Sequence, residues 1–379
     1  MDNFTKFKNL CLIGLLFLLT ACVGGLKSHE KPEGFVSPVE KYGKIRLVEI
    51  DGRRRLCKEN GEPVQLKGMS TMGLQWEEWI LSEEAFDALA YDWRCDVVRL
   101  AMYITEGGYK DDPFGMLAKV EKGIKLASDR GLYVIVDWHV LTPGDPNAND
   151  YLNAGKSLSQ YSAIKKDHPE YSGPELFFAY LSQKYGDLPN ILWETANEPN
   201  KLSKSWSESL LPYHQKILNA VRLYDKDGLG DNIVICGTGT WSQEVDAPIG
   251  NEASDPEGQV MYTVHFYAGT HGQWLMDRVK NALDRGLAVF CTEWGTSEAD
   301  GGQNGKVYIA ESEDWLDFFE ANGVSWCNWS LARAAQSSAA FKPNAASFPK
   351  DLDGDGVPNW KDSDLSASGT YVRGRIRGE

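Results

Sequence analysis

The chain has 379 residues, of which 42% are hydrophobic, and its formal net charge at pH 7 is −15. This length is ordinary for one large α/β domain, and the apolar content can form a core without disulfides or structural metals. Nucleic acid is not expected as a partner, because phosphate binding needs a basic patch and the run Arg53 to Arg55 is short. The 13 Trp and 16 Tyr suit either an aromatic core or a sugar-binding cleft, since pyranose faces are apolar.

The N-terminus has the pattern of a bacterial secretion signal. Lys6 and Lys8 precede an apolar stretch, residues 10–20, that is too short to span a bilayer as a mature helix. The stretch ends in Leu-Thr-Ala-Cys, which resembles a lipobox. We therefore expect removal of residues 1–21 and lipidation of Cys22, which would anchor the secreted protein to a membrane of the cell envelope or to the cell surface. The alternative is an ordinary signal peptide with a chance cysteine.

A polar segment, residues 22–42, is expected to tether the lipid to one folded domain over residues 43–379. At the start of this domain, residues 45–50 and 64–68 flank a stretch rich in turn residues, among them Gly52 and Gly61. The first half of this region predicts a short β-hairpin that caps the floor of the domain.

From residue 64 onward, short apolar runs alternate with amphipathic segments. The expected strands are residues 64–69, 96–101, 133–137, 191–194, 233–236, 260–264, 288–292 and 324–328, and helical patterns between them include residues 116–129, 175–185, 213–224 and 313–321. Eight such units predict a (β/α)8 TIM barrel, with a doubly wound sheet as the alternative. No G-x-G-x-x-G phosphate loop opens a helix, so the usual sign of the alternative is missing.

Polar and aromatic side chains follow seven of the eight predicted strands. In chain order they are Arg99, His139, Asn197 with Glu198, Trp241, His265 with Tyr267, Glu293 and Trp329. Barrel enzymes build their active sites at the C-terminal ends of the strands, so we expect these side chains to meet at one site.

Two carboxylates in this set suit glycoside hydrolysis. Glu198 and Glu293 follow the fourth and seventh strands, which face each other across a barrel. The reaction needs one acid to protonate the leaving oxygen and one carboxylate to meet the cationic sugar carbon.

The ordered motifs resemble glycoside hydrolase family 5, in particular its bacterial endoglucanases. The matching segments are Asn197-Glu198-Pro199 within residues 193–199, Thr292-Glu293-Trp294-Gly295, and residues 68–76, 98–103, 137–139, 265–271 and 326–331. The resemblance covers about residues 40–379. It implies a retaining endo-1,4-β-glucanase (a cellulase) that acts on β-glucan polysaccharide by double displacement, without a cofactor for catalysis.

The resemblance also implies roles for single residues. Glu198 would be the general acid/base and Glu293 the nucleophile. Arg99 should lie near Glu293 and keep it ionised, because a nearby cation lowers the pKa of a carboxyl group. Tyr267 should donate a hydrogen bond to Glu293, and Asn197 should contact the sugar 2-hydroxyl.

The remaining candidates support the site or bind sugar. His139 and His265 should hold its polar network. Trp76 and Trp329 should stack on sugar rings, with Tyr103 and Trp241 as further candidates.

Two positions depart from the family pattern and leave substrate preference open. Met72 stands where family members often carry His, and Ala334 stands where they often carry Lys, which Arg333 could replace. Activity on mixed-linkage glucan, xyloglucan or mannan therefore stays an alternative. A surface glycan-binding lipoprotein without catalysis and an adhesion protein built around a calcium loop are alternatives from other classes.

Residues 351–362 read D-x-D-x-D-G-x-x-N-x-x-D, the spacing of an EF-hand-like loop. It resembles thrombospondin type 3 and dockerin calcium loops. The expected ligands are Asp351, Asp353, Asp355, Val357, Asn359 and Asp362, with Asp364 as a further candidate. The insertion, residues 351–364, falls between the eighth strand and a final helix over residues 365–375, so a bound calcium would be structural. The alternative is an ordinary acidic loop.

Five cysteines of the expected mature domain show no metal-binding spacing: Cys57, Cys95, Cys236, Cys291 and Cys327. We expect buried free thiols, with a Cys57–Cys95 disulfide as the alternative. The protein is expected to be a monomer.

Overall fold

The computed structural model describes residues 31–224 and 232–379. The predicted signal peptide, the lipidation site Cys22 and the first part of the tether lie outside these ranges. Within the described ranges, no helix is both long enough and apolar enough to cross a membrane. The end of the expected tether forms α1 (Pro38–Tyr42), which begins with a capping box between Ser37 and Glu40. The amide of Val39 bonds the carbonyl of Gly131, so this helix is attached to the domain.

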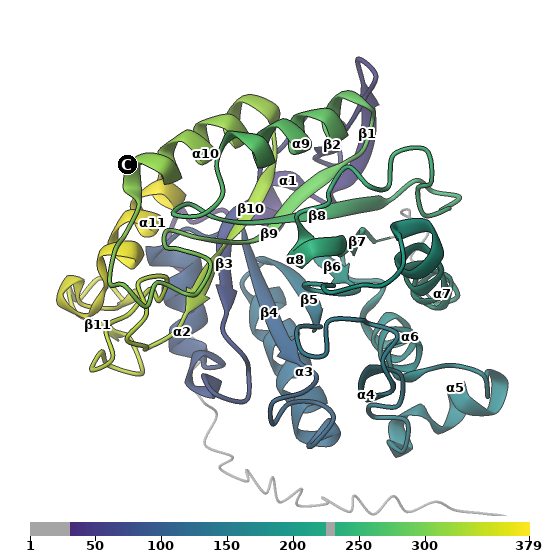
Figure 1. The fold of residues 1–379 in the computed structure, drawn as a ribbon. Coiled ribbons are helices and arrows are strands. Elements are labelled where there is room, and N and C mark those ends of the chain that lie inside the picture. Colours follow the sequence, from purple (N-terminus) through teal and green to yellow (C-terminus); the bar gives the residue numbers. More distant parts are fainter. Residues whose placement is uncertain (1–30, 225–231) are drawn as a thin grey trace, which may run out of the picture.

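Eight parallel strands close into a barrel in the order β10-β3-β4-β5-β6-β7-β8-β9 (Figure 1). They are β3 (Lys67–Thr71), β4 (Val97–Tyr103), β5 (Tyr133–His139), β6 (Ile191–Glu194), β7 (Val234–Cys236), β8 (Val260–Tyr267), β9 (Val289–Gly295) and β10 (Ser325–Leu331). The predicted barrel is confirmed, and the doubly wound alternative is wrong because the sheet closes on itself.

Several strands differ from the prediction at their ends. Val64 belongs to the preceding hairpin region, because its amide bonds the carbonyl of Leu56. At their C-terminal ends, β8, β9 and β10 each run three residues further than predicted, so that His265 and Glu293 pair within the ladder. His265 and Glu293 therefore lie within the strands, inside the mouth of the barrel, and do not mark the ends of the strands.

Helices surround the barrel (Figure 1). The α-helices after α1 are α2 (Glu83–Asp87), α3 (Pro113–Asp129), α4 (Asn149–Leu152), α5 (Ser162–Asp167), α6 (Gly173–Tyr185), α7 (Leu211–Arg222), α8 (Gly239–Ser242), α9 (Gln273–Asp284), α10 (Ile309–Asn322) and α11 (Ala367–Arg377). Short helical turns are η1 (Glu78–Ile80), η2 (Ala88–Asp92), η3 (Ser159–Tyr161), η4 (Trp206–Leu210) and η5 (Asp362–Asp364). The final helix begins two residues later than predicted, because the Ser366 side chain accepts the Gly369 amide as an N-cap.

The predicted N-terminal hairpin is present as β1 (Arg46–Ile50) and β2 (Arg53–Cys57). Its two-residue turn, Asp51-Gly52, has positive φ at both positions, as a type I′ hairpin turn requires. Leu47 and Leu56 pack into one apolar cluster with residues from the beginnings of the barrel strands, such as Val97. The hairpin therefore closes the N-terminal end of the barrel and leaves the other end open.

The segment after β10 contains the predicted insertion, with the small antiparallel pair β11 (Lys350–Asp351) and β12 (Pro358–Asn359). Trp360 in this insertion is buried, and its ring packs against Phe341 at a centroid distance of 4.8 Å and against Trp79 at 6.2 Å. The insertion is thus joined to the domain core through an aromatic cluster.

The five cysteines, Cys57, Cys95, Cys236, Cys291 and Cys327, are free and buried. The prediction of buried thiols is confirmed, and the Cys57–Cys95 disulfide is wrong.

Candidate active site

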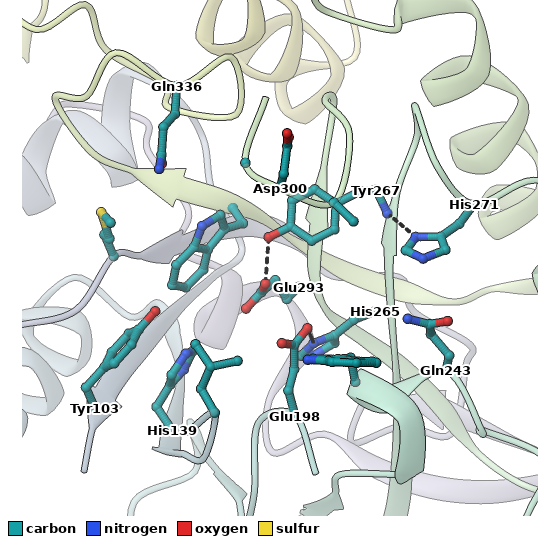
Figure 2. A pocket seen from close by; sticks show the side chains of 16 residues that line it. Tyr103, His139, Glu198, Gln243, His265, Tyr267, His271, Glu293, Asp300 and Gln336 are labelled. Carbon is teal, nitrogen blue, oxygen red and sulfur yellow. Dashed lines mark hydrogen bonds and ion pairs between the residues drawn. The ribbon is translucent and has the colours of Figure 1, made fainter. Parts of the chain in front are cut away.

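A cavity of about 570 Å³ opens at the C-terminal ends of the strands (Figure 2). Its lining includes predicted residues from seven different strands or the loops that follow them: Tyr103, His139, Glu198, Trp241, His265, Tyr267, Glu293 and Trp329. Met72 lines it as well. The volume is in the usual range for small-molecule and saccharide subsites.

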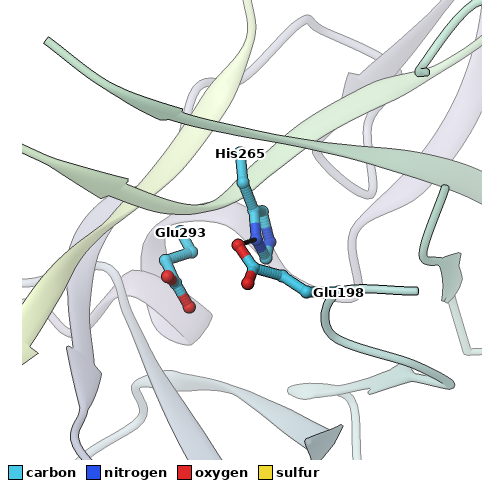
Figure 3. A group of neighbouring side chains, drawn as sticks. All are labelled: Glu198, His265 and Glu293. Carbon is cyan, nitrogen blue, oxygen red and sulfur yellow. Dashed lines mark hydrogen bonds and ion pairs between the residues drawn. The ribbon is translucent and has the colours of Figure 1, made fainter. Parts of the chain in front are cut away.

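The two predicted catalytic carboxylates face each other in this cavity (Figure 3). Glu198 follows β6, and Glu293 lies in β9. One carboxylate oxygen of Glu198, one of Glu293 and one ring nitrogen of His265 all lie within 4.8 Å of one another. Retaining glycosidases place their carboxyl groups about 5–5.5 Å apart, whereas inverting ones leave about 6.5–9.5 Å for a water. The spacing here is that of the retaining class.

The environments of the two carboxyl groups differ. Arg99 Nη1 donates to Glu293 Oε2 at 3.2 Å, and the Tyr267 hydroxyl donates to Glu293 Oε1 at 2.8 Å. Burial raises the pKa of Glu293, and Arg99 and Tyr267 oppose this rise. Burial and then the charge of Glu293 raise the pKa of Glu198 well above its usual range. The pair therefore divides into a group that ionises first, Glu293, and a group that holds its proton, Glu198.

Arg99 is fully buried and connects several site residues. Its Nη2 donates to Asn197 Oδ1 at 2.7 Å and lies 3.0 Å from Asp137 Oδ2, while its Nε donates to Glu194 Oε2 at 2.7 Å. The Asn197 side chain is thereby held with its amide nitrogen 3.1 Å from His139 Nε2. One guanidinium thus orients the amide that is expected to meet the sugar 2-hydroxyl.

His139 lies in a polar and aromatic stack. Its Nδ1 is 2.6 Å from Asp137 Oδ2, and its ring stacks on Tyr103 at 3.9 Å and on Trp329 at 5.6 Å between centroids. Burial and then the nearby Arg99 charge lower the pKa of His139 well below its usual range, so the ring is neutral. A neutral His139 that donates from Nδ1 to Asp137 leaves Nε2 to accept from the Asn197 amide.

The expected sugar platforms differ in exposure. Trp329 is 7% exposed within the cavity, whereas Trp76 is 46% exposed, next to Tyr103 at a centroid distance of 4.8 Å. Trp241 is 39% exposed and lies between Thr240 and Ser242, all three with φ between 53° and 57°. Successive left-handed residues are costly for non-glycine side chains and occur at functional sites.

This left-handed turn is fastened to the segment that carries the acid/base. Trp241 donates its amide to the carbonyl of Pro199 at 3.0 Å, and the Ser242 hydroxyl donates to the carbonyl of Asn197 at 2.6 Å. The strained turn thus places Trp241 in the wall of the cavity that Glu198 also lines.

Several lining residues were missed by the sequence analysis. Asp300 and Gln336 lie above the carboxylate pair in Figure 2, and Gln243 and His271 lie to its right. Asp300, Gln336 and Gln243 come from loops without a periodic pattern, so no signal marked them, whereas His271 ends the segment 265–271 that resembles the family. Glu194 did carry a signal, since it is an acidic residue that ends the apolar strand β6.

Arg333 does not replace the Lys that the family often carries near this site. Its guanidinium lies 4.8 Å from the Trp79 ring centroid and donates to Ser347 Oγ at 2.6 Å, away from the cavity lining. The possibility that Arg333 supplies the missing charge is therefore wrong.

A closed (β/α)8 barrel with two such facing carboxylates at its mouth has the architecture of a retaining glycoside hydrolase. The family model described as Cellulase (glycosyl hydrolase family 5) matches residues 57–335, so the chain belongs to this family. Catalysis in the family needs no cofactor.

Three similar proteins place the chain within the family. Endoglucanase C of Evansella cellulosilytica is 41% identical over 364 residues, which cover 89% of this chain and 42% of that protein. The structure of a thermostable, halotolerant GH5 cellulase from an Icelandic hot spring isolate has a TM-score of 0.79 at 39% identity, covering 91% of this chain and 98% of the other. The catalytic domain of a Thermobifida fusca endoglucanase, in complex with cellotetraose, has a TM-score of 0.73 at 33% identity, covering 90% and 100%. The chain spans less than half the length of Endoglucanase C.

Proposed function

We propose that the protein is a retaining endo-1,4-β-glucanase that cleaves internal bonds of cellulose and related β-glucans as a monomer. The observation that carries this proposal is the closely spaced pair Glu198 and Glu293, with unequal environments, in the barrel mouth of a family 5 chain. A relative that binds cellotetraose in the same fold supports a β-glucan as the substrate.

The geometry suits a double displacement. Glu293 attacks the anomeric carbon while Glu198 gives its proton to the departing glycosidic oxygen, so the carbon–oxygen bond breaks and a glycosyl ester forms on Glu293. Glu198, now ionised, takes a proton from a water molecule while the water oxygen attacks the same carbon. The ester bond to Glu293 then breaks. The product keeps its anomeric configuration, and both carboxyl groups return to their starting state.

The neighbouring residues bind and orient the sugar in this scheme. Asn197 would bond the 2-hydroxyl, where a bond strengthens in the transition state, in place of one of the bonds that its amide nitrogen now makes to His139 Nε2 and the Val140 carbonyl. Trp329 and Trp241 line the same cavity as the carboxylate pair and offer aromatic faces to a sugar. Met72 gives the wall an apolar side chain where the family often has an imidazole, so a polar contact with sugar hydroxyls is replaced by packing.

A panel of soluble polysaccharides tests this proposal. Purified protein should lower the viscosity of a soluble cellulose derivative faster than it releases reducing ends, because internal cleavage shortens chains early. Higher kcat/KM on mannan, xyloglucan or mixed-linkage glucan would assign the alternative substrates. Binding to the glucans without release of reducing ends would favour the non-catalytic lipoprotein.

We propose further that the loop at residues 351–362 binds a structural calcium ion. Support comes from its ligand spacing, from the positive φ of Gly354 and Gly356, and from Asp351, whose carboxylate accepts the amides of both glycines. The oxygen-rich ligand set fits calcium, but the loop carboxylates form no group of three ligand atoms within 4.8 Å in the described structure. Binding would therefore have to draw these side chains inward.

Removal of calcium is expected to lower the melting temperature and to leave activity well below melting nearly unchanged. An ion that binds only the folded state stabilises it by mass action, and the loop is tied to the core through Trp360. Calorimetry with EDTA, with calcium added back, measures the effect. An unchanged melting temperature would make the loop an ordinary acidic turn, and loss of activity without unfolding would tie the ion to the active site.

We propose that Cys22 carries lipid and that the enzyme is exported and attached to a membrane of the cell envelope. The support is the charged start, apolar stretch and lipobox-like end of residues 1–22. Cys22→Ser is expected to move the protein from the membrane fraction to the soluble fraction, or to leave it unprocessed, because the acceptor sulfur is gone. Equal membrane fractionation of variant and parent would argue against lipidation.

A further inference from the structure

Glu194 is a fully buried carboxylate beneath the catalytic pair, at the end of β6 and four residues before Glu198. Both of its oxygens accept hydrogen bonds from Arg99, at 2.7 Å from Nε and 3.1 Å from Nη2. Its Oε1 also accepts from the Thr292 hydroxyl at 2.7 Å. The other titratable groups that face it are Asp137 on β5, His265 on β8, Cys327 on β10 and Glu198, and Arg99 links it to Glu293 on β9.

The contacts of Glu194 select its ionised form. Both carboxylate oxygens accept from the Arg99 guanidinium, which is cationic and can only donate, and this favours the ionised form of Glu194. Burial raises the pKa of Glu194, and the charge of Arg99 opposes that rise.

The direction of the Thr292 hydrogen bond determines which ring nitrogen of His265 carries the hydrogen. The Thr292 hydroxyl has one hydrogen, which it donates to Glu194, so Thr292 Oγ1 can only accept from its other partners. His265 Nε2 lies 2.9 Å from Thr292 Oγ1 and therefore carries the ring hydrogen. Thr263 Oγ1, 2.5 Å from Thr292 Oγ1, fits as a second donor to the same oxygen.

His265 then turns an acceptor toward the acid/base. Burial lowers the pKa of His265 well below its usual range, so the neutral ring has a single hydrogen, which is on Nε2. Its Nδ1 is a lone-pair acceptor 3.0 Å from Glu198 Oε1 (Figure 3). A protonated Glu198 donates into this lone pair, whereas an ionised Glu198 would face it with another acceptor.

We propose that Glu194 is a positioning residue that keeps Glu198 in its proton-donating form by fixing the tautomer of His265 through Thr292. Glu194 touches no substrate and acts only through these two residues. The same carboxylate holds Arg99, which donates to Glu293, so one buried anion orients both halves of the catalytic pair. The catalytic meaning of this inference rests on the proposed glycosidase function, whereas the tautomer itself does not.

The variant Glu194→Gln tests the chain of bonds. Its amide nitrogen must face a donor, and when it faces Thr292 the hydroxyl turns toward His265 Nε2, which moves the ring hydrogen to Nδ1. That hydrogen would stabilise ionised Glu198 and lower its pKa. The basic limb of the plot of kcat/KM against pH, which reports this pKa, should therefore move to lower pH by about one unit. The nitrogen-15 spectrum, in which the full chain has six histidines, should show His265 changing from the Nε2–H to the Nδ1–H form.

Asp137→Asn is the matched control, because it removes another buried anion from Arg99 without touching Thr292. It should leave the His265 tautomer at Nε2–H. Thr292→Val should shift the basic limb in the same direction as Glu194→Gln, and Thr292→Ser, which keeps a hydroxyl, should restore it. The Thr292 pair also decides the matter if Glu194→Gln does not fold.

Parent-like basic limbs and His265 tautomers in both folded Glu194→Gln and folded Thr292→Val variants would overturn the proposal, because the valine removes the hydroxyl whichever way the new amide faces. A parent protein that shows the Nε2–H tautomer but cleaves no glucan would instead contradict the proposed function. The hydrogen bonds from Glu194 through Thr292 to His265 would still be supported. The two failures are therefore distinguishable.

Discussion

Replacement of Glu293 by Gln is expected to lower kcat on a soluble cellulose derivative by about 10⁴-fold or more. Gln has the size of Glu. Its amide oxygen can accept from Arg99, and its NH2 can donate to the Tyr267 hydroxyl oxygen, so the site keeps its shape. An amide oxygen cannot form the glycosyl ester on which the double displacement depends. In enzymes that form covalent intermediates, loss of the nucleophile lowers kcat by a factor of this size. Initial rates by reducing-end assay measure the effect.

Glu320→Gln is the matched control for this variant, because it makes the same change on the exposed face of α10, far from the cavity. It should keep the parent's rate, and both variants should melt near the parent. Substantial turnover by a correctly folded Glu293→Gln variant would contradict the nucleophile assignment.

Glu198→Ala should lose about 10²- to 10⁴-fold in activity on polysaccharide, the usual worth of a general acid/base. A sugar alkoxide is a poor leaving group and needs the proton that Glu198 supplies. An aryl glycoside with an acidic phenol leaves without that help, so its glycosylation step should suffer much less.

Azide should accelerate the Glu198→Ala variant on the aryl glycoside and not on polysaccharide. Azide attacks the glycosyl-enzyme without general-base assistance, and the space left by the missing carboxyl group can admit it. The product should be a β-glycosyl azide, identified by NMR. Failure of azide to accelerate the aryl substrate, or near-normal rates on polysaccharide, would remove Glu198 from the acid/base role.

The fold could be predicted because two signals agreed along the whole chain. Apolar runs such as residues 133–137 alternate with helical patterns, and nearly every run is followed by a polar or aromatic side chain at the place where a barrel has its site. The prediction of the hairpin rested on turn chemistry, and Asp51-Gly52 indeed forms a turn with positive φ at both positions.

The details inside the mouth of the barrel were beyond the sequence. Which nitrogen of His265 faces Glu198 depends on contacts between β6, β8 and β9, and these are set by strand register. Arg333 shows the same limit: its charge suited the site, yet its ring partner Trp79 and the hydroxyl of Ser347 hold it elsewhere. Asp300 and Gln336 reach the cavity from loops whose paths no periodicity reports.

Retaining hydrolysis by Glu198 and Glu293 can be tested by the anomeric form of the first product. Hydrolysis of a short cello-oligosaccharide can be followed by proton NMR before mutarotation equilibrates the reducing ends. The new reducing ends should appear first as the β-anomer, with the α-anomer growing only as mutarotation proceeds. Early appearance of the α-anomer would mean a single inverting displacement and would rule out Glu293 as the nucleophile.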